Sequence, residues 1–233
     1  MKWKWTNMNI EDTQNHRTRV AAQRREKTRA KLLESALLVF AKKGLHAVID
    51  DVIAQAGVAR GSFYNYFRTN EELMEAVAGE LNNELLLAID NVVRSYEDPA
   101  ERIACGTRLL LHAVMRFPLY GTFMARLPYP AANTGFLGSL YLQRDVALGV
   151  EAHRFKNIDQ KVGTDLLAGV VLSAAYAGTR EALNPEYPGA SAQAMLRALG
   201  LENQEAERLS SLPLPSFELP ADSLLRRTNL LDC

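Results

Sequence analysis

Six residues suited to hydrogen bonding or close approach lie within one short stretch: Arg60, Gly61, Ser62, Tyr64, Asn65 and Tyr66. An arginine can donate two hydrogen bonds to O6 and N7 of a guanine, and an asparagine can pair with N6 and N7 of an adenine. Serine and tyrosine hydroxyls can reach phosphate oxygens, and a glycine lets the backbone come close to its partner. These residue types predict contacts with DNA, although the same stretch could instead be a purely structural cluster of aromatic side chains.

An amphipathic helix is expected before this stretch, over residues 27–43. Its apolar residues recur at spacings of three and four, and they are Leu33, Ala36, Leu37, Phe40 and Ala41. Lys42 and Lys43 suit the carboxyl end of a helix, where cations interact favourably with the helix dipole. Gly44 can then adopt the left-handed conformation that ends a helix. The pattern therefore predicts a helix that stops at position 44.

Two short helices around a tight turn should follow. The sequence predicts helices over 49–56 and 60–67, with Gly57 at the turn because one residue there needs a positive φ. Phe63 and Phe67 lie four positions apart and are expected to point inward as core residues. Such an arrangement, here at positions 48–67, is typical of a helix-turn-helix. Its second helix enters a DNA major groove about 12 Å wide.

The rest of the chain is predicted to be mostly helical. Thr69, followed by two glutamates, is typical of a helix N-cap and should open a helix that runs to about position 96. Later helices are expected over 99–117, then over a short stretch after Pro118 that ends at about position 126, and over 136–155, 159–183 and 191–199. The tail over 211–233 contains prolines and is expected to be irregular. The predicted fold class is therefore all-α.

The charge is divided unevenly along a chain that is neutral overall. Its 233 residues hold 27 Lys and Arg against 27 Asp and Glu, but residues 1–70 hold 13 basic against 6 acidic side chains. A polyanion would therefore meet the N-terminal end. We expect residues 1–24 to form a flexible basic arm. The residues expected to hold DNA phosphates, where the first helix begins, are Arg25, Lys27, Thr28 and Arg29. Any one of them could instead be simply solvated.

The sequence carries no motif of catalysis, metal binding or export. It has no HExxH, GxSxG, P-loop, GxGxxG or CxxC pattern, and its four histidines are scattered. Cys105 and Cys233 show no paired spacing, which favours a reducing compartment. No apolar run is long enough to span a bilayer. We therefore expect a cytoplasmic protein that is not an enzyme, holds no metal or cofactor and makes no membrane contact.

Residues 27–77 closely resemble the DNA-binding domain of the TetR family of bacterial regulators. The resemblance rests on several features in a fixed order: Phe40-Ala41 with Gly44, VIAQAGV at 52–58, RGSFYNYF at 60–67 and EEL at 71–73. In this family the positions that match Arg60 to Ser62 and Tyr64 to Tyr66 are the usual DNA contacts. The resemblance covers about a quarter of the chain, and the remainder is similar to the family only in helical layout and length.

The chain departs from the family pattern at three places. Many members have Ser or Thr before the second helix, Ser before the third helix and Lys after the last phenylalanine. The matching residues here are Val48-Ile49, Ala59 and Asn70, and Asp50 adds an acid near the groove. Weaker helix caps and the loss of one phosphate contact are therefore expected.

The resemblance implies a fold of about nine helices in two domains. Residues 25–85 would form the DNA-binding domain, and residues 86–210 would form a helical domain that binds a small molecule and dimerises. The helices over 159–183 and 191–199 would pack against their copies in a homodimer, although they could instead pack within one subunit.

The function that the resemblance implies is a repressor that a small molecule releases from a palindromic double-stranded DNA operator. There are two alternatives. One is a DNA-organising protein without a small-molecule signal, and the other is an enzyme-like helical domain fused to a helix-turn-helix. Candidates for an apolar ligand pocket are His112, Phe117, Tyr120, Phe123, Met124, Tyr141 and Arg144. Each of these could instead be an ordinary core or surface residue.

Overall fold

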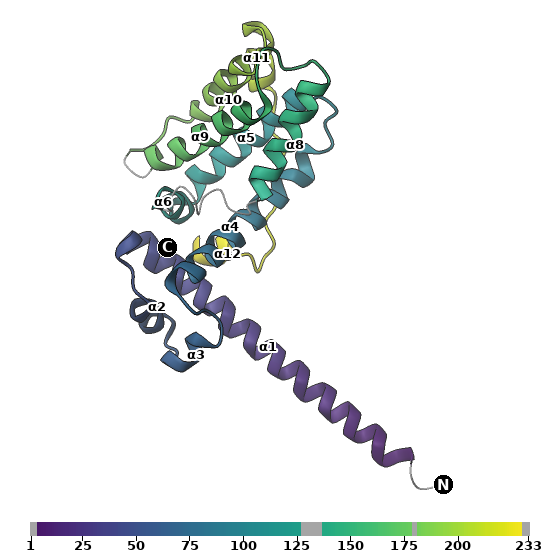
Figure 1. Ribbon diagram of the computed structural model, residues 1–233, viewed down its shortest axis with the longest axis vertical. Coiled ribbons are helices and arrows are strands. Elements are labelled where there is room, and N and C mark those ends of the chain that lie inside the picture. The colour runs from purple at the N-terminus through teal and green to yellow at the C-terminus, as the bar shows by residue number, and fades with distance from the viewer. Residues whose placement is uncertain (1–3, 127–136, 179–180, 230–233) are drawn as a thin grey trace.

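The computed structural model describes residues 4–126, 137–178 and 181–229. Within these ranges the chain forms eleven α-helices, one short 3₁₀ helix and no strand, which confirms the all-α fold class. Figure 1 shows a small head of α1 to α3 at one end, a larger helical bundle at the other, and α4 between them. The elements are α1 (Lys4–Lys43), η1 (Gly44–His46), α2 (Ile49–Ala56), α3 (Arg60–Tyr64), α4 (Asn70–Val93), α5 (Pro99–Arg116), α6 (Pro118–Arg126), α8 (Leu137–Glu151), α9 (Gln160–Gly178), α10 (Tyr187–Ala198), α11 (Asn203–Ser211) and α12 (Leu224–Asn229).

The first helix is longer than the sequence predicted. α1 begins at Lys4, so residues 4–24 are helical and do not form the flexible arm that we expected. Neither proline nor glycine occurs before Gly44, so nothing in this stretch interrupts a helix. The side chains at 21–27 are exposed, and this half of α1 stands away from the rest of the molecule (Figure 1). Gly44 follows the helix with a φ of 60°, as predicted.

The head is held together by one core that α4 shares. Leu33, Phe40, Val52, Phe63 and Leu73 come from α1, α2, α3 and α4, are at most 2% exposed and belong to one cluster. Burying a large apolar side chain contributes roughly 1.5 to 3 kcal/mol to stability. The short helices α2 and α3 could not persist alone, since isolated helices of this length are unstable in water. Packing on α1 and α4 therefore fixes their positions.

Local signals mark several boundaries of the helices in the head where the sequence predicted, but α3 ends at Tyr64 and not at position 67. Gly57 joins α2 to α3 with a φ of 59°, the left-handed conformation expected at the turn. Thr69 is the N-cap of α4, because its hydroxyl oxygen accepts the backbone N–H of Glu72 at 3.1 Å. The Glu72 carboxylate in turn accepts the backbone N–H of Arg68 at 2.7 Å. These two hydrogen bonds satisfy backbone amides at the start of α4.

The larger bundle has a second core of its own. Ile103, Val146, Leu167 and Leu196, from α5, α8, α9 and α10, are at most 2% exposed and pack in one cluster. Cys105 of α5 is buried and free. The other cysteine of the sequence, at position 233, lies outside the described residues.

Two helices near the C-terminus were not predicted. α11 follows α10 after a short connection, and α12 lies within the tail over 211–233 that we expected to be irregular. That expectation is wrong for residues 224–229, because the last proline of the tail is Pro220 and apolar Leu224 and Leu225 follow it. Residues 230–233 lie outside the described residues.

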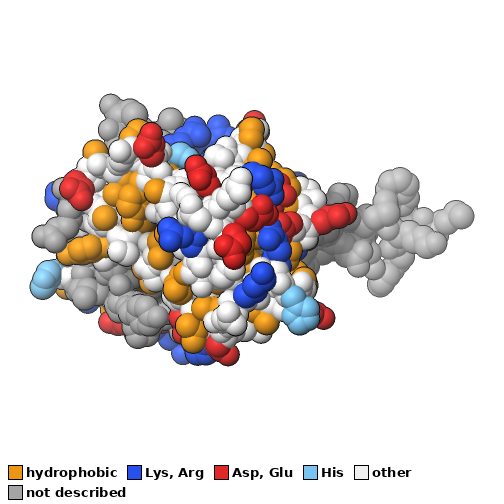
Figure 2. Space-filling view, turned by 90° about the horizontal axis from the view of Figure 1, so that it is seen from above, with side chains coloured by type: hydrophobic (Ala, Val, Ile, Leu, Met, Phe, Trp, Pro, Cys, Tyr) orange, Lys and Arg blue, Asp and Glu red, His pale blue; other side chains and the backbone are white. Residues whose placement is uncertain are grey.

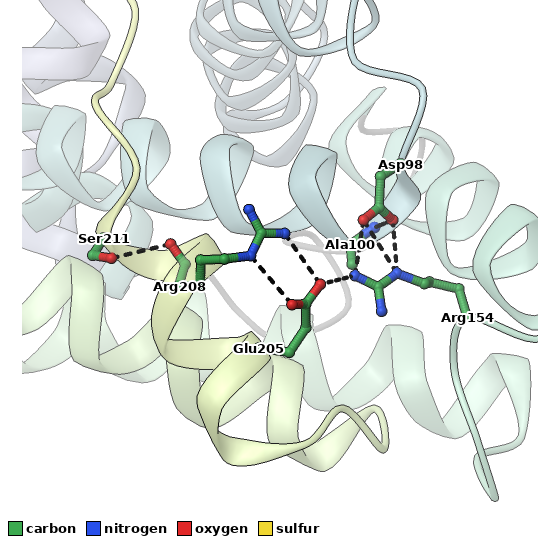
Figure 3. Close-up of polar contacts among 6 residues, drawn as sticks. All are labelled: Asp98, Ala100, Arg154, Glu205, Arg208 and Ser211. Atoms are coloured by element: carbon green, nitrogen blue, oxygen red, sulfur yellow. Dashed lines mark hydrogen bonds and ion pairs between the residues drawn. The ribbon is translucent and has the colours of Figure 1, made fainter.

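An ion-pair network ties the start of α5 to α11 (Figure 3). The Arg154 guanidinium, from the connection between α8 and α9, contacts Asp98 at 2.9 Å and Glu205 at 2.5 Å. Glu205 also pairs with Arg208 of its own helix at 3.2 Å. Asp98 accepts the backbone N–H of Ala100 at 2.9 Å and so caps α5. The network therefore holds together three segments that are distant in the sequence.

We expect this network to make stability depend on pH in the acidic range. Hydrogen bonds from Arg208 and then from Arg154 lower the pKa of Glu205 to about 2, from an ordinary value of 4.5. Since the folded pKa is the lower one, the contribution of Glu205 is complete above pH 4.5 and is lost as the pH falls toward about 2. Urea unfolding of the wild type and of Glu205→Gln, from neutral pH to strong acid, should give stabilities that converge at the acid end. Parallel curves would contradict this assignment.

Candidate functional site

The six predicted DNA-reading residues lie on α3 and on the turn that follows it. Arg60, Gly61, Tyr64 and Asn65 are exposed, whereas Ser62 and Tyr66 are half-buried. Phe63 and Phe67 point inward as predicted, with ring centroids 6.0 Å apart. A Cβ at Gly61 would meet no atom within 4 Å, so the space in front of the helix is open. The outer face of α3 is therefore accessible to a large partner.

Arg60 already has an anionic neighbour in the free protein. Its guanidinium lies 3.0 Å from a carboxylate oxygen of Asp50, and both side chains are more than 60% exposed. A hydrogen bond with Tyr64 and the charge of Asp50 raise the pKa of Arg60. An ion pair this exposed contributes little to stability, so Arg60 can exchange Asp50 for another partner at small cost.

The basic residues on α1 have different surroundings from those predicted. Arg25 and Lys27 are exposed, whereas Arg29 pairs with Glu80 of α4 at 3.4 Å. The Thr28 hydroxyl donates to the Arg24 carbonyl at 2.9 Å. Because α1 begins at Lys4, the backbone amides here bond within the helix, and the expectation that a helix start would help to bind phosphate is wrong.

Lys31 is a further cation near the reading head that the sequence analysis missed. It is exposed, and its ammonium nitrogen is 3.9 Å from the position of a Cβ at Gly57, the turn of the helix-turn-helix. Lys31 lies three positions after Thr28 and four after Lys27, so all three share one face of the helix. This spacing could have identified it.

Two of the three departures from the family pattern have structural substitutes, whereas Ala59 leaves the start of α3 without a side-chain cap. Val48 has no side-chain acceptor for the start of α2, but the Asp51 carboxylate accepts the Val48 N–H at 3.1 Å. A hydrogen bond from Lys43 is the main cause that lowers the pKa of Asp51. The Asn70 amide donates to the Ala47 carbonyl at 2.8 Å and so ties α4 to the segment before α2. Asn70 therefore has a structural contact at the position where the family often has a lysine.

A cavity of about 450 Å³ lies in the bundle, between α4, α5, α6, α8 and α9. Pockets for small molecules have volumes of about 300 to 1,000 Å³ and are mostly apolar. Three of the seven predicted pocket residues line this cavity, namely Tyr120, Met124 and Tyr141. Apolar side chains of its wall include Leu86, Ile89, Leu110, Leu167, Val171 and Leu172.

The other four predicted pocket residues do not line the cavity. His112 is exposed on α5. Phe117 and Phe123 are buried in the core cluster that the bundle shares with the head, and the Phe123 ring lies 6.3 Å from that of Phe40. Arg144 contacts two carboxylates of the cavity wall. Helical spacing predicts that such residues face inward, but it does not tell whether they meet a neighbour or an empty space.

One end of the cavity carries an uncharged polar pair, formed by the predicted Tyr120 and by Asn82, which the sequence analysis missed. The Tyr120 hydroxyl donates to Asn82 Oδ1 at 3.0 Å, and Asn82 Nδ2 donates to the Ala78 carbonyl at 2.8 Å. Burial raises the pKa of Tyr120, so its hydroxyl stays protonated. This end therefore offers neutral hydrogen-bonding groups.

The other polar end holds two buried carboxylates paired with two arginines. Arg144 contacts Asp90 at 2.8 Å and Asp145 at 2.8 Å, and Arg102 contacts Asp145 at 3.5 Å. The hydrogen bonds that Arg144 donates, first to Asp145 and then to Asp90, raise the pKa of Arg144. The Arg144 guanidinium also lies over the Tyr141 ring, 5.2 Å from its centroid. Each arginine of this end therefore has a carboxylate partner, and the charges are balanced.

α6 joins the cavity to the head. Tyr120 and Met124 of α6 line the cavity, whereas Phe123 of the same helix packs against Phe40 of α1. α6 therefore contacts both the cavity and α1.

The face seen in Figure 2, viewed from the end of the bundle away from α3, carries interspersed cations, anions and apolar side chains. Among the described residues, no cluster of three or more His, Cys, Asp or Glu side chains is suited to a metal ion. Over the same part of the chain, no helix is both long and apolar enough to cross a bilayer.

Comparison with known families gives two matches along the chain. Residues 32–77 match the profile described as "Bacterial regulatory proteins, tetR family", and residues 98–211 match "Tetracyclin repressor-like, C-terminal domain". The HTH-type transcriptional repressor KstR2 of Mycobacterium tuberculosis is 34% identical over 86 residues, 36% of this chain and 42% of that protein. The HTH-type transcriptional regulator TtgR of Pseudomonas putida is 33% identical over 98 residues, 41% of this chain and 43% of that protein. These matches span less than half the length of either relative.

Solved structures are similar over most of the chain. The crystal structure of RolR in complex with resorcinol has a TM-score of 0.68 and 31% identity, and the match covers 84% of this chain and all of that one. The regulator FadR of Bacillus subtilis, solved with stearoyl-CoA, has a TM-score of 0.60 at 16% identity over 72% of this chain and 96% of that one. Because the identity to FadR is only 16%, this similarity shows a shared fold and nothing more.

Proposed function

The chain belongs to the TetR family of bacterial regulatory proteins, and from this we propose that it is a homodimeric transcriptional repressor that a small molecule releases from its operator. The observation that carries the proposal is the connection through α6 between a ligand-sized cavity and the head that exposes Arg60. Residues 25–85 would act as the DNA-binding domain and residues 86–210 as the sensing and dimerising domain.

The proposed DNA interface has a base-reading part and a phosphate part. Arg60 to Ser62 and Tyr64 to Tyr66 would enter the major groove, and the phosphates would meet Arg25, Lys27, Thr28, Arg29 and Lys31. The exposure of α3 and the open space around Gly61 support this role. Two recognition helices about 34 Å apart in a dimer would match successive major grooves of a palindromic site.

The proposed dimer interface uses α9 together with α10. α9 leaves Val162 and Tyr176 more than half exposed in the single chain. A second copy packed on α9 would cover them, and the many small residues of α9 would allow a close approach.

Replacement of Arg60 by alanine should weaken binding to the operator by about 1 to 3 kcal/mol and relax one base position. Replacement of Lys27, a proposed phosphate contact, should weaken binding to all DNA by a similar factor. Fluorescence anisotropy with the operator and with a scrambled duplex would measure both effects. If Arg60→Ala lost equal affinity for the two duplexes, its base-reading role would be wrong.

We propose that the effector is a small uncharged molecule with hydroxyl groups. Both arginines at the charged end of the cavity are paired with carboxylates, so neither is free to bind an anionic ligand. Neutral hydrogen-bonding groups lie at the other end, with apolar walls between the two. The similar regulator RolR was solved with resorcinol, a molecule of this kind, which makes resorcinol a suitable first probe.

Ligand release can be tested with the full-length protein and a labelled operator duplex. Resorcinol should raise the Kd for the operator, whereas benzoate, an anion of similar size, should leave it unchanged. Release by benzoate alone would contradict the proposed ligand class. Binding that showed no preference for any sequence, and no response to either probe, would favour the DNA-organising alternative.

A further inference from the structure

The chain beyond α11 returns to the DNA-binding head. Residues 212–223 connect the end of the bundle to α12, and the first of them is held by Arg108 of α5, which donates to the Leu212 carbonyl at 2.6 Å. Leu214 and Phe217 pack along the core cluster shared with the head, and Leu219 is buried in it. This segment lies outside the ranges 32–77 and 98–211 that match the family profiles.

α12 is attached to α4 by a half-buried carboxylate. Glu84 accepts the backbone N–H of Leu224 at 2.8 and 2.9 Å with its two oxygens, and the N–H of Leu225 at 3.4 Å. The first amides of a helix have no partner within the helix, so a side chain of α4 satisfies them here. These hydrogen bonds therefore all come from one residue that is 140 positions away in the sequence.

The other contacts of α12 are with α1 and the shared core. Leu224, Leu225 and Thr228 are each 1% exposed, and the two leucines belong to the cluster that contains Phe40 of α1 and Phe123 of α6. Arg227 lies 3.8 Å from Glu34 of α1. Figure 1 shows α12 between α4 and α1, at the junction of the head and the bundle.

We propose that α12 is a positioning element that sets the orientation of the DNA-reading head relative to the bundle, and that Glu84 holds it in place. The inference rests on the proposed function, since orientation matters only if two heads of a dimer must match two half-sites. With α12 detached, each head stays folded around its own core, but the spacing between the two heads is no longer fixed. The protein then loses the advantage of binding both half-sites at once.

The test compares a duplex carrying the full operator with a duplex carrying one half-site. Glu84→Ala should weaken binding to the full operator about tenfold and leave half-site binding unchanged. In hydrogen exchange, the amides of α12 and of the facing part of α1 should become faster while those of α10 stay the same. Glu97→Ala, which removes an exposed carboxylate after the end of α4, is the matched control and should behave as wild type.

Glu84→Gln keeps a carbonyl acceptor, so its affinity for the full operator should lie between those of the wild type and of Glu84→Ala. It is used in place of the alanine variant if that variant does not fold. Unchanged affinity for the full operator would overturn the inference, and so would an equal loss on both duplexes, since that is the result of a misfolded head. A wild-type protein that binds both duplexes equally would overturn the proposed function itself.

Discussion

Replacement of Phe63 by alanine is expected to destabilise the DNA-binding head by about 3 to 5 kcal/mol, the usual cost of removing a fully buried phenylalanine. Phe63 is 0% exposed, and its ring contacts those of Tyr64 and Phe67 at centroid distances of 5.5 and 6.0 Å. α3 has only five residues, so little besides this side chain holds it against the core. Operator binding should be lost together with the fold of the head.

Urea unfolding, followed by hydrogen exchange of the amides of α2 and α3, would measure this effect. Tyr64→Ala is the matched control, because it removes the neighbouring aromatic ring, which is 46% exposed. That variant should lose DNA affinity but keep its stability within about 1 kcal/mol. If the two variants were equally stable, Phe63 would not be the anchor of the reading helix.

Replacement of Asp145 by alanine is expected to destabilise the bundle by about 3 kcal/mol, because breaking a buried ion pair leaves its partner charged and uncompensated. The Asp145 side chain is 7% exposed and contacts Arg144 at 2.8 Å and Arg102 at 3.5 Å. The variant cavity would also carry an excess positive charge. Benzoate, which should not bind the wild type, is therefore expected to bind this variant and stabilise it.

Asp165 provides the control for Asp145, since both residues line the cavity and both are paired. The pair of Asp165 with Lys161 is exposed, with side chains 56% and 80% accessible, so its removal should cost less than about 1 kcal/mol. Thermal unfolding with and without benzoate would compare the two variants. Equal losses of stability, or no effect of benzoate on Asp145→Ala, would contradict the balanced charge that we assign to the cavity.

The DNA-reading head was predictable from the sequence because its signals are local. Gly44 and Gly57 mark their turns by conformation, Thr69 caps the helix that follows it, and the spacing of Phe63 and Phe67 predicts their burial. Each of these features depends on residues within a few positions of one another. The length of α1 was missed because the residues before position 27 lack the regular apolar spacing that predicts a helix.

The cavity and α12 were much less predictable because they depend on contacts between distant segments. Asn82 meets Tyr120, and Asp90 meets Arg144, only after α4 has packed against α6 and α8. A polar residue on a mostly apolar helix face gives no indication of which partner it will meet. α12 was hidden for the same reason, since its first two amides are satisfied by Glu84 of α4.

The central claim is that this protein reads a specific palindromic site with α3. The measurement that tests it most directly is selection of bound fragments from the source genome by the full-length protein, followed by footprinting of the enriched sequence. We predict one discrete protected palindrome whose half-sites are centred about 10 base pairs, one helical turn, apart or a multiple of that distance. Protection without any preferred sequence, or enrichment that Arg60→Ala leaves unchanged, would contradict the claim.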